Sequence, residues 1–255
     1  MDEILKVACK SPGVPEIFRS IQGEGRNSGR PRTFLRLSGC NLQCHWCDTP
    51  YTWNWEGTDW PHSDDRPGAP AKYSQEAETL ALTFEDLATR VLELPAEGLV
   101  VTGGEPLVQM TALTRFIRHL KAQAPDLLIE IETNGTIAPD AELTTQVDLF
   151  MVSPKLENSA NRPGSALRPA ALQAFAKLPT AHFKFVAATP QDVERVAAIA
   201  SEFAIPAERI YIMPLGTSSE RLIRTGALLI DSVLSHGFNY SDRLHIHLFG
   251  DSRGT

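Results

Sequence analysis

The sequence predicts an α/β fold with a parallel sheet or a barrel, formed as a single domain over residues 1–255. Two observations support this prediction. Short runs rich in branched apolar residues alternate with helical stretches, and repeated strand–helix units of this kind build parallel sheets. Hydrophobic residues make up 42% of the chain, which is enough for a substantial core.

Most of the candidate strands are short and apolar throughout, as expected for parallel strands covered on both faces. Polar residues directly follow several of them. A cofactor site on one face of such a fold requires polar groups at successive strand ends. The candidate strands are Thr33–Leu37, Leu99–Thr102, Leu127–Glu132, Asp148–Val152, His182–Val186, Arg209–Met213 and Leu244–Phe249.

The predicted helices begin at recognisable caps. Thr83 is a candidate N-cap, and Asp86 lies three residues later in the position of a capping box. Thr189 and Pro190 open another helix as its N-cap and its first residue. One helical stretch begins at residue 83, and the others lie near 110–123, 166–178, 190–203 and 218–236.

A segment at about 53–81 interrupts the alternation of strands and helices. It is rich in Pro, Gly and Asp, and it contains Trp53, Trp55 and Trp60. Loops of this length are usually functional or disordered. We predict an insertion loop that acts as a covering flap, as a dimer contact or as a purely structural excursion, and the pattern leaves all three open.

Composition and charge exclude several classes of partner. The net charge of −7 disfavours a nucleic-acid partner held through its phosphates. No apolar run approaches the length of about 20 residues that a membrane helix needs, and the N-terminus lacks the basic and apolar regions of a signal peptide. With its clustered free thiols, the chain is predicted to be cytoplasmic and to bind neither nucleic acid nor membrane.

Three of the four cysteines, Cys40, Cys44 and Cys47, fall within eight residues with the spacing C-x3-C-x2-C. Three thiolates are one ligand short of a closed zinc site. A four-iron cluster held by three cysteines instead keeps one iron open for chemistry. The alternative is a zinc site completed by His45 or Cys9, although Cys9 alone is expected to be a buried structural cysteine.

This spacing resembles the signature of the radical S-adenosylmethionine (SAM) superfamily, in which the open iron binds SAM. Gly39 and Trp46 beside the cysteines fit that pattern, as do Thr102–Pro106, Glu132–Gly135 and Ser153–Lys155 at successive strand ends. The resemblance implies a partial, modified (β/α)6-type barrel in which Cys40, Cys44 and Cys47 bind a [4Fe–4S] cluster. It assigns SAM contacts to Trp46, Asp48, Gly104, Glu105, Asn134, Ser153 and Lys155.

Within that superfamily, the chain resembles the 7-carboxy-7-deazaguanine synthases. The similarity includes Gln22–Gly25, Arg36, Asp48–Thr49 and Met213–Pro214. The family converts 6-carboxy-5,6,7,8-tetrahydropterin to 7-carboxy-7-deazaguanine with loss of ammonia, on the way to 7-deazapurines such as queuosine. The resemblance implies a [4Fe–4S] cluster, SAM and Mg2+ as cofactors, an electron donor such as flavodoxin or ferredoxin, and a homodimer.

The same resemblance assigns the substrate contacts. The substrate carboxylate needs a cation, and the planar guanidinium of Arg36 gives a bidentate match. Glu24 offers paired acceptors to the amidine edge of the pterin, and Thr49 matches a Mg2+ ligand. No side chain is implied to react beyond the cofactor-driven chemistry. The substrate contacts are Ile21, Gln22, Gly23, Glu24, Arg36, Thr102, His247 and Thr255.

Two alternatives compete with this interpretation. A glycyl-radical enzyme activase shares the cysteine spacing and a compact barrel, but it has no need of Arg36 or of the Gln22–Gly25 run. A non-enzymatic zinc-binding module would use the same thiolates and no SAM.

Overall fold

The computed structural model describes residues 3–162 and 164–255. Its centre is a sheet of 11 strands, of which six run parallel and follow one another in chain order. These six are β4 (Pro31–Leu37), β6 (Gly98–Gly103), β7 (Leu128–Thr133), β8 (Leu149–Val152), β9 (Ala181–Ala187) and β10 (Ile210–Pro214). The strand order is open, because no pairing joins its two ends within the described residues.

The remaining strands flank the parallel six. β1 (Ile4–Ser11) pairs antiparallel with β4, with β2 (Val14–Pro15) and with β5 (Thr79–Thr83). β3 (Ile17–Ile21) forms an antiparallel pair with β4, and β11 (Asn239–Tyr240) pairs parallel with β10 at the far edge. The sequence pattern predicted none of these five strands.

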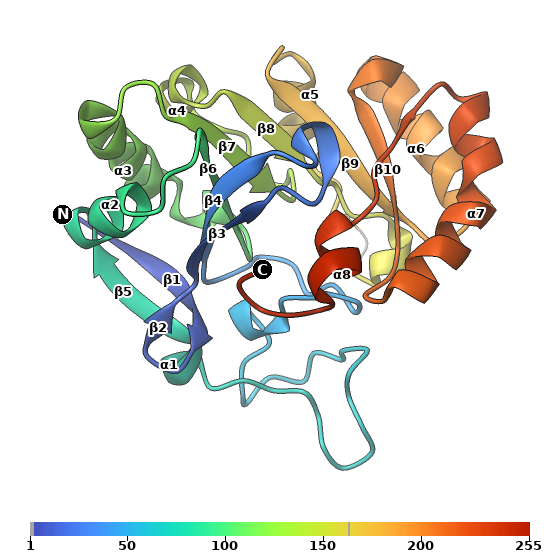
Figure 1. Cartoon of the computed structure of the whole chain (residues 1–255). Coiled ribbons are helices and arrows are strands. Elements are labelled where there is room, and N and C mark those ends of the chain that lie inside the picture. The colour runs from blue at the N-terminus through green and yellow to red at the C-terminus, as the bar shows by residue number, and fades with distance from the viewer. Residues whose placement is uncertain (1–2, 163) are drawn as a thin grey trace.

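The longer helices cover the outer side of the curved sheet (Figure 1). Each buries one apolar stripe in a core that also contains the large side chains Phe116, Phe150, Phe175, Phe183 and Phe185. The helices are α1 (Gln75–Glu78), α2 (Phe84–Leu92), α3 (Met110–Gln123), α4 (Ala141–Gln146), α5 (Pro169–Ala176), α6 (Pro190–Phe203), α7 (Ser219–Ser235) and α8 (Leu244–Phe249).

Both predicted helix caps are confirmed. The hydroxyl of Thr83 accepts a hydrogen bond from the backbone N–H of Asp86 at 3.1 Å, and Thr189 with Asp192 forms a complete capping box. The predicted helices near 110–123, 190–203 and 218–236 match α3, α6 and α7 closely, whereas the helix predicted for 166–178 is shorter.

The strand predicted at Leu244–Phe249 is wrong, because this segment is the helix α8. The edge of the sheet beyond β10 is already taken by β11, and Ser241 continues that contact through its N–H to the carbonyl of Ile212. The chain then leaves the sheet and crosses its inner side (Figure 1), where no strand edge is offered and the backbone must satisfy its hydrogen bonds locally.

The segment at 53–81 packs against the cysteine loop before it enters the sheet as β5. Trp53 is buried, and the ring of His62 contacts the backbone carbonyl of Cys47 through Nε2 at 2.8 Å. Lys72 Nζ donates to the side-chain oxygen of Asn54 and to the carbonyl of Trp60, both at 2.7 Å. These contacts hold the segment against the loop that carries the cysteines.

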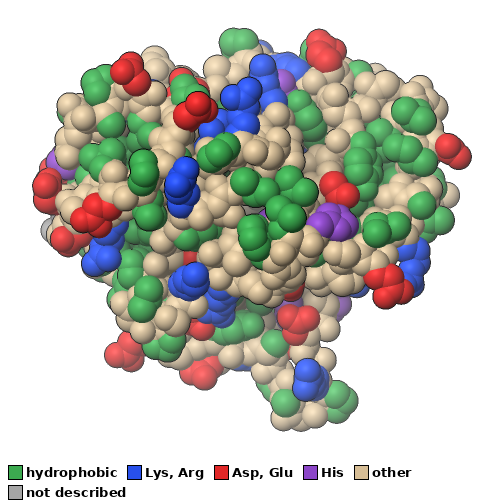
Figure 2. Space-filling model, in the orientation of Figure 1, with side chains coloured by type: hydrophobic (Ala, Val, Ile, Leu, Met, Phe, Trp, Pro, Cys, Tyr) green, Lys and Arg blue, Asp and Glu red, His purple; other side chains and the backbone are tan. Residues whose placement is uncertain are grey.

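On the face shown in Figure 2, acidic and basic side chains are interspersed among apolar ones. None of the helices formed by residues 3–162 and 164–255 combines the length and the apolar character that a membrane crossing requires.

Candidate active site

A cavity of about 420 Å³ lies at the carboxyl ends of the parallel strands. Successive strands each contribute polar or small residues to its wall, because parallel strands present their carboxyl ends on one side. The strand ends that line it are Thr102–Gly104 after β6, Glu132–Asn134 at the end of β7, Ser153 and Lys155 after β8, Val186 on β9 and Met213 on β10.

The cysteine loop forms one wall of this cavity. Cys40, Cys44 and Cys47 all line it, and none of them takes part in a disulfide. Asn161 Nδ2 donates to Cys44 Sγ at 3.1 Å, and the backbone N–H of Leu42 donates to Cys40 Sγ at 3.4 Å. The sulfurs are therefore held in place by polar donors while their free sides face the cavity.

Burial raises the pKa of all three thiols, to about 11 for Cys47. The sulfurs become ligands only when a soft metal centre displaces their protons. Among residues 3–162 and 164–255, no three His, Cys, Asp or Glu side chains converge on one point that could hold a single metal ion. Three free thiols on one wall of the cavity fit a four-iron cluster, which takes each thiolate at a different iron.

Six of the seven predicted SAM contacts line the cavity, and Glu105 does not. Glu105 is fully buried behind the wall. Its carboxylate accepts hydrogen bonds from Leu107 N–H, the Thr133 hydroxyl and Asn134 N–H at 2.9, 2.7 and 2.6 Å. Glu105 thus fixes the ends of β6 and β7 relative to each other.

Gly104 lies where the backbones of the β6 loop and the cysteine loop meet. A Cβ atom at this position would lie 2.1 Å from the carbonyl oxygen of Gly39 and 3.0 Å from Cys40 Cβ. Only glycine permits this approach, and the backbone N–H of Glu105 donates to Gly39 O at 2.8 Å. Glycine at 104 therefore allows the cysteine loop to pack directly against the loop after β6.

Arg36, the predicted carboxylate ligand, projects from β4 into the cavity and is anchored by Glu16. Arg36 Nε donates to Glu16 Oε1 at 2.9 Å, and Tyr51 Oη donates to Glu16 Oε2 at 2.9 Å. Burial disfavours the charged guanidinium, but Tyr51 and Glu16 raise the pKa of Arg36 above its ordinary value. Within the described parts of the chain, the two terminal nitrogens of Arg36 make no hydrogen bond, so this fork is available to a ligand.

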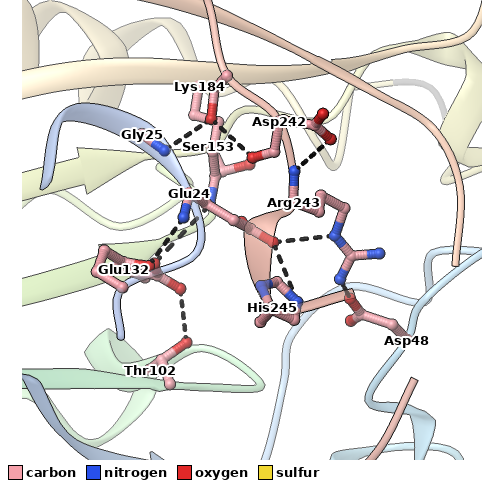
Figure 3. Close-up of polar contacts among 12 residues, drawn as sticks. Glu24, Gly25, Asp48, Thr102, Glu132, Ser153, Lys184, Asp242, Arg243 and His245 are labelled. Carbon is pink, nitrogen blue, oxygen red and sulfur yellow. Dashed lines mark hydrogen bonds and ion pairs between the residues drawn. The ribbon is translucent and has the colours of Figure 1, made fainter. Parts of the chain in front are cut away.

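Glu24 lies at the centre of a network of charges (Figure 3). One oxygen accepts from Lys184 Nζ, and the other accepts from Arg243 Nε at 3.0 Å. Arg243 also pairs with Asp48, and His245 Nε2 lies 3.9 Å from the Glu24 carboxylate. Burial alone would raise the pKa of Glu24, but Lys184, Arg243 and His245 hold it well below its usual range. Glu24 is therefore an ionised acceptor, already engaged by two cations.

Glu132 extends this network along the strand ends (Figure 3). Its carboxylate lies 3.8 Å from Lys184 Nζ and accepts from Thr102 Oγ1 at 2.9 Å and from Gln22 Nε2 at 3.1 Å. Gln22 and Thr102, both predicted substrate contacts, are thereby aligned on the same wall as Glu24. Glu132 lines the cavity but was not predicted as a site residue, although it belongs to one of the strand-end motifs.

The histidine that faces the cavity is His245, and His247 is not among its lining residues. His247 was assigned by the family resemblance, within a segment that was predicted to be a strand, in which residues two apart share a face. In a helix, neighbours two apart diverge by about 200°, and His247 instead lies 3.2 Å from Asp242. A Cβ atom on Gly23 would fall 2.0 Å from His245 Nδ1, so glycine at 23 permits the close packing of α8.

The remaining predicted residues also line the cavity: Ile21, Gly23, Thr49 and Thr255. The hydroxyl of Thr49 lies 3.6 Å from Cys47 Sγ. The segment that ends at Thr255 is held in place by Arg253, whose guanidinium lies 3.5 Å from the centre of the Tyr51 ring and bonds to Glu78 at 2.7 Å.

Comparisons with known proteins agree with this geometry. Residues 21–176 match the model of a family described as a 4Fe-4S single cluster domain. A 7-carboxy-7-deazaguanine synthase from Pyrobaculum aerophilum is 35% identical to the chain, across 94% of this chain and 96% of that protein. The chain belongs to the 7-carboxy-7-deazaguanine synthase family.

Further relatives of this family support the assignment. The 7-carboxy-7-deazaguanine synthase of Rhodopirellula baltica is 32% identical over 95% of this chain and 88% of its own length. The crystal structure of QueE from Escherichia coli superimposes with a TM-score of 0.66 at 25% identity, and covers 94% of this chain and 95% of that one. The shared structure is a mixed α/β fold with an unclosed sheet.

Membership of the 7-carboxy-7-deazaguanine synthase family disfavours both alternatives that the sequence left open, an activase and a zinc-binding module. Three charged residues of the site were not predicted from the sequence: Lys184, Arg243 and Glu16. Lys184 could have been suspected, because a charge inside the apolar run His182–Val186 is unusual. Arg243 and Glu16 carry no such signal.

Proposed function

We propose that this chain is a radical SAM enzyme that converts 6-carboxy-5,6,7,8-tetrahydropterin to 7-carboxy-7-deazaguanine with loss of ammonia. The observation that carries the proposal is a single cavity lined by three free thiols, by the guanidinium of Arg36 and by the ionised carboxylate of Glu24. A radical source and complementary charges for the two polar ends of a carboxypterin thus share one space.

The protein groups bind and orient the substrate. The terminal nitrogens of Arg36 form a planar fork for the substrate carboxylate, and its Nε bond to Glu16 fixes the direction of the fork. Glu24 accepts from the N–H groups of the pterin amidine edge. Gln22 and Thr102 reach the ring from the neighbouring wall, and His245 takes the place predicted for His247.

The cofactors supply the reactivity. When bound, the cluster and SAM would supply the radical chemistry that acts on the substrate carbon bearing the carboxylate. Cys40, Cys44 and Cys47 would hold the cluster, and Gly104, Ser153 and Lys155 lie where they could contact SAM. The α8 helix and the segment ending at Thr255 cover the cavity and limit the access of water.

An anaerobic assay tests this function. The reconstituted protein, given SAM, a reductant and 6-carboxy-5,6,7,8-tetrahydropterin, is expected to form a product with the mass of 7-carboxy-7-deazaguanine. The same protein without reductant serves as the control. A brown, cluster-loaded protein that cleaves SAM but leaves the carboxypterin unchanged would refute the proposal.

Thr49 is proposed to bind Mg2+ together with the substrate carboxylate. A single hydroxyl is a weak ligand for a hard cation, so the metal is expected to bind only with substrate present. Turnover of the wild type should rise with Mg2+, and Thr49→Ala should reduce this response, as measured by the rate at increasing Mg2+ concentration. Thr58→Ala, which removes a threonine hydroxyl outside the cavity lining, provides the control. A wild-type rate that is independent of Mg2+ would exclude this role for Thr49.

The same proposal implies an oligomeric state, a cellular compartment and an electron donor. We infer a cytoplasmic homodimer with one partial, modified (β/α)6-type radical SAM domain per chain, into which 53–81 is inserted beside the cluster loop. An electron donor such as flavodoxin or ferredoxin would reduce it. Exposed apolar side chains on α7, namely Ile223, Ile230 and Leu234, support self-association, and four unpaired cysteines suit a reducing compartment.

A further inference from the structure

Lys184 is a buried cation that the proposed reaction does not itself require. It lies on β9 at a position where alternate residues face inward with Val186, while Phe183 and Phe185 enter the core. Its side chain is 5% exposed, and its ammonium group pairs with Glu24 and lies 3.8 Å from Glu132. Burying a lysine ammonium costs free energy unless the charge is paired with buried anions.

We propose that Lys184 is a positioning residue that holds the Glu24 carboxylate as a hydrogen-bond acceptor beside Glu132, so that this wall selects a pterin over a 2-oxo pteridine. This inference rests on the proposed function. The amidine edge of a pterin carries two N–H donors, which match a carboxylate. A lumazine has a carbonyl in place of the amino group, and an ionised carboxylate repels it.

The charges around Glu24 explain why Lys184 alone can control the preference for a pterin. Facing Glu24 are the cations Lys184 and Arg243, the imidazole of His245, and the carboxylates of Glu132 and, through Arg243, Asp48. Two cations thus face three carboxylates. Without Lys184, only Arg243 pairs with Glu24, and the buried Glu24 carboxylate loses one of the two cations that favour its ionised form.

The loss of Lys184 therefore changes the chemistry of recognition. The pKa of Glu24 would rise, and its carboxylate would take up a proton more readily. A protonated carboxyl group has one donor and one acceptor. One donor and one acceptor match the carbonyl and N–H edge of a lumazine as well as they match the edge of a pterin. The selectivity for the pterin would therefore fall and would depend on pH.

The test measures binding of 6-carboxypterin and 6-carboxylumazine to the reconstituted, SAM-loaded protein by fluorescence between pH 6 and 9. The wild type should prefer the pterin at every pH. Lys184→Met should lose roughly 10- to 100-fold of this preference, most strongly at low pH, where the carboxyl is protonated. Lys184→Arg, which keeps the charge, should restore the preference.

Controls separate this role from a structural one. Lys72→Met removes another hydrogen-bonded ammonium, at a position outside the cavity lining, and should leave the preference unchanged. Lys184→Gln replaces the methionine variant if the latter fails to fold. If Lys184→Met keeps the preference and pH profile of the wild type, the inference is wrong while the proposed function stands. A wild type that binds neither probe overturns both.

Discussion

Cys44→Ala is expected to abolish turnover, because it removes one of the three thiolates that hold the cluster. No neighbouring residue can replace that ligand. Among residues 3–162 and 164–255, the fourth cysteine, Cys9, is the only other thiol, and it lies on β1 and not in the cavity lining. Iron content and visible absorbance after anaerobic reconstitution measure the effect directly, without reference to substrate.

Cys9→Ala provides the matched control for this experiment. Both side chains are buried thiols whose pKa is raised by burial, so the two variants remove the same group from similar surroundings. The Cys9 variant should keep its iron and its activity and lose only some packing energy. A Cys44→Ala protein that retains a complete cluster would show that the trio is not the ligand set.

Arg36→Ala is expected to weaken binding of the carboxypterin by roughly 2–5 kcal/mol, as the loss of a buried charge partner does. SAM binding should persist, because Arg36 is not among the predicted SAM contacts, which lie in the cysteine loop and after β6 to β8. Calorimetric titration of each ligand separates the two effects. Unchanged affinity for the carboxypterin would refute the assignment of Arg36.

The ion pair between Arg36 and Glu16 requires a second variant in this experiment. Removing Arg36 leaves Glu16, which is 0% exposed, with Tyr51 as its remaining partner. Breaking a buried pair costs about 3–5 kcal/mol of stability. Arg36→Ala combined with Glu16→Gln removes that uncompensated charge. The double variant should recover stability in thermal unfolding but not affinity for the carboxypterin, which distinguishes binding from folding.

The parts of the site that could be predicted are those fixed by residues close together in the chain. The cysteine spacing, the caps at Thr83 and Thr189, and the glycines and polar groups after β6 and β7 act over a few residues, so their geometry follows from local sequence. Because parallel strands end on one side, the predicted strand order also predicted that Thr102, Asn134 and Ser153 would meet.

The wrong predictions share a cause as well. The alternating histidines of Leu244–Phe249 imitate a strand, but a strand needs a free edge, and β11 already occupies it. The antiparallel strands β1 and β5 were missed because they pair across about 75 residues of chain, a partnership that local pattern does not record. β2 and β3 were also missed, although they pair with strands close to them in the chain.

The sequence by itself determined the chemistry of one wall, since Arg36, the three cysteines and Thr49 fall within a short stretch whose spacing is sufficient to define a cluster loop beside a cation. The opposite wall was decided by the tertiary structure. Glu24 meets Lys184 and Arg243 across 160 and 219 residues of chain, and only the curvature of the sheet and the return of α8 across it bring these charges together. The two cations then outweigh the effect of burial and keep Glu24 ionised before any substrate binds.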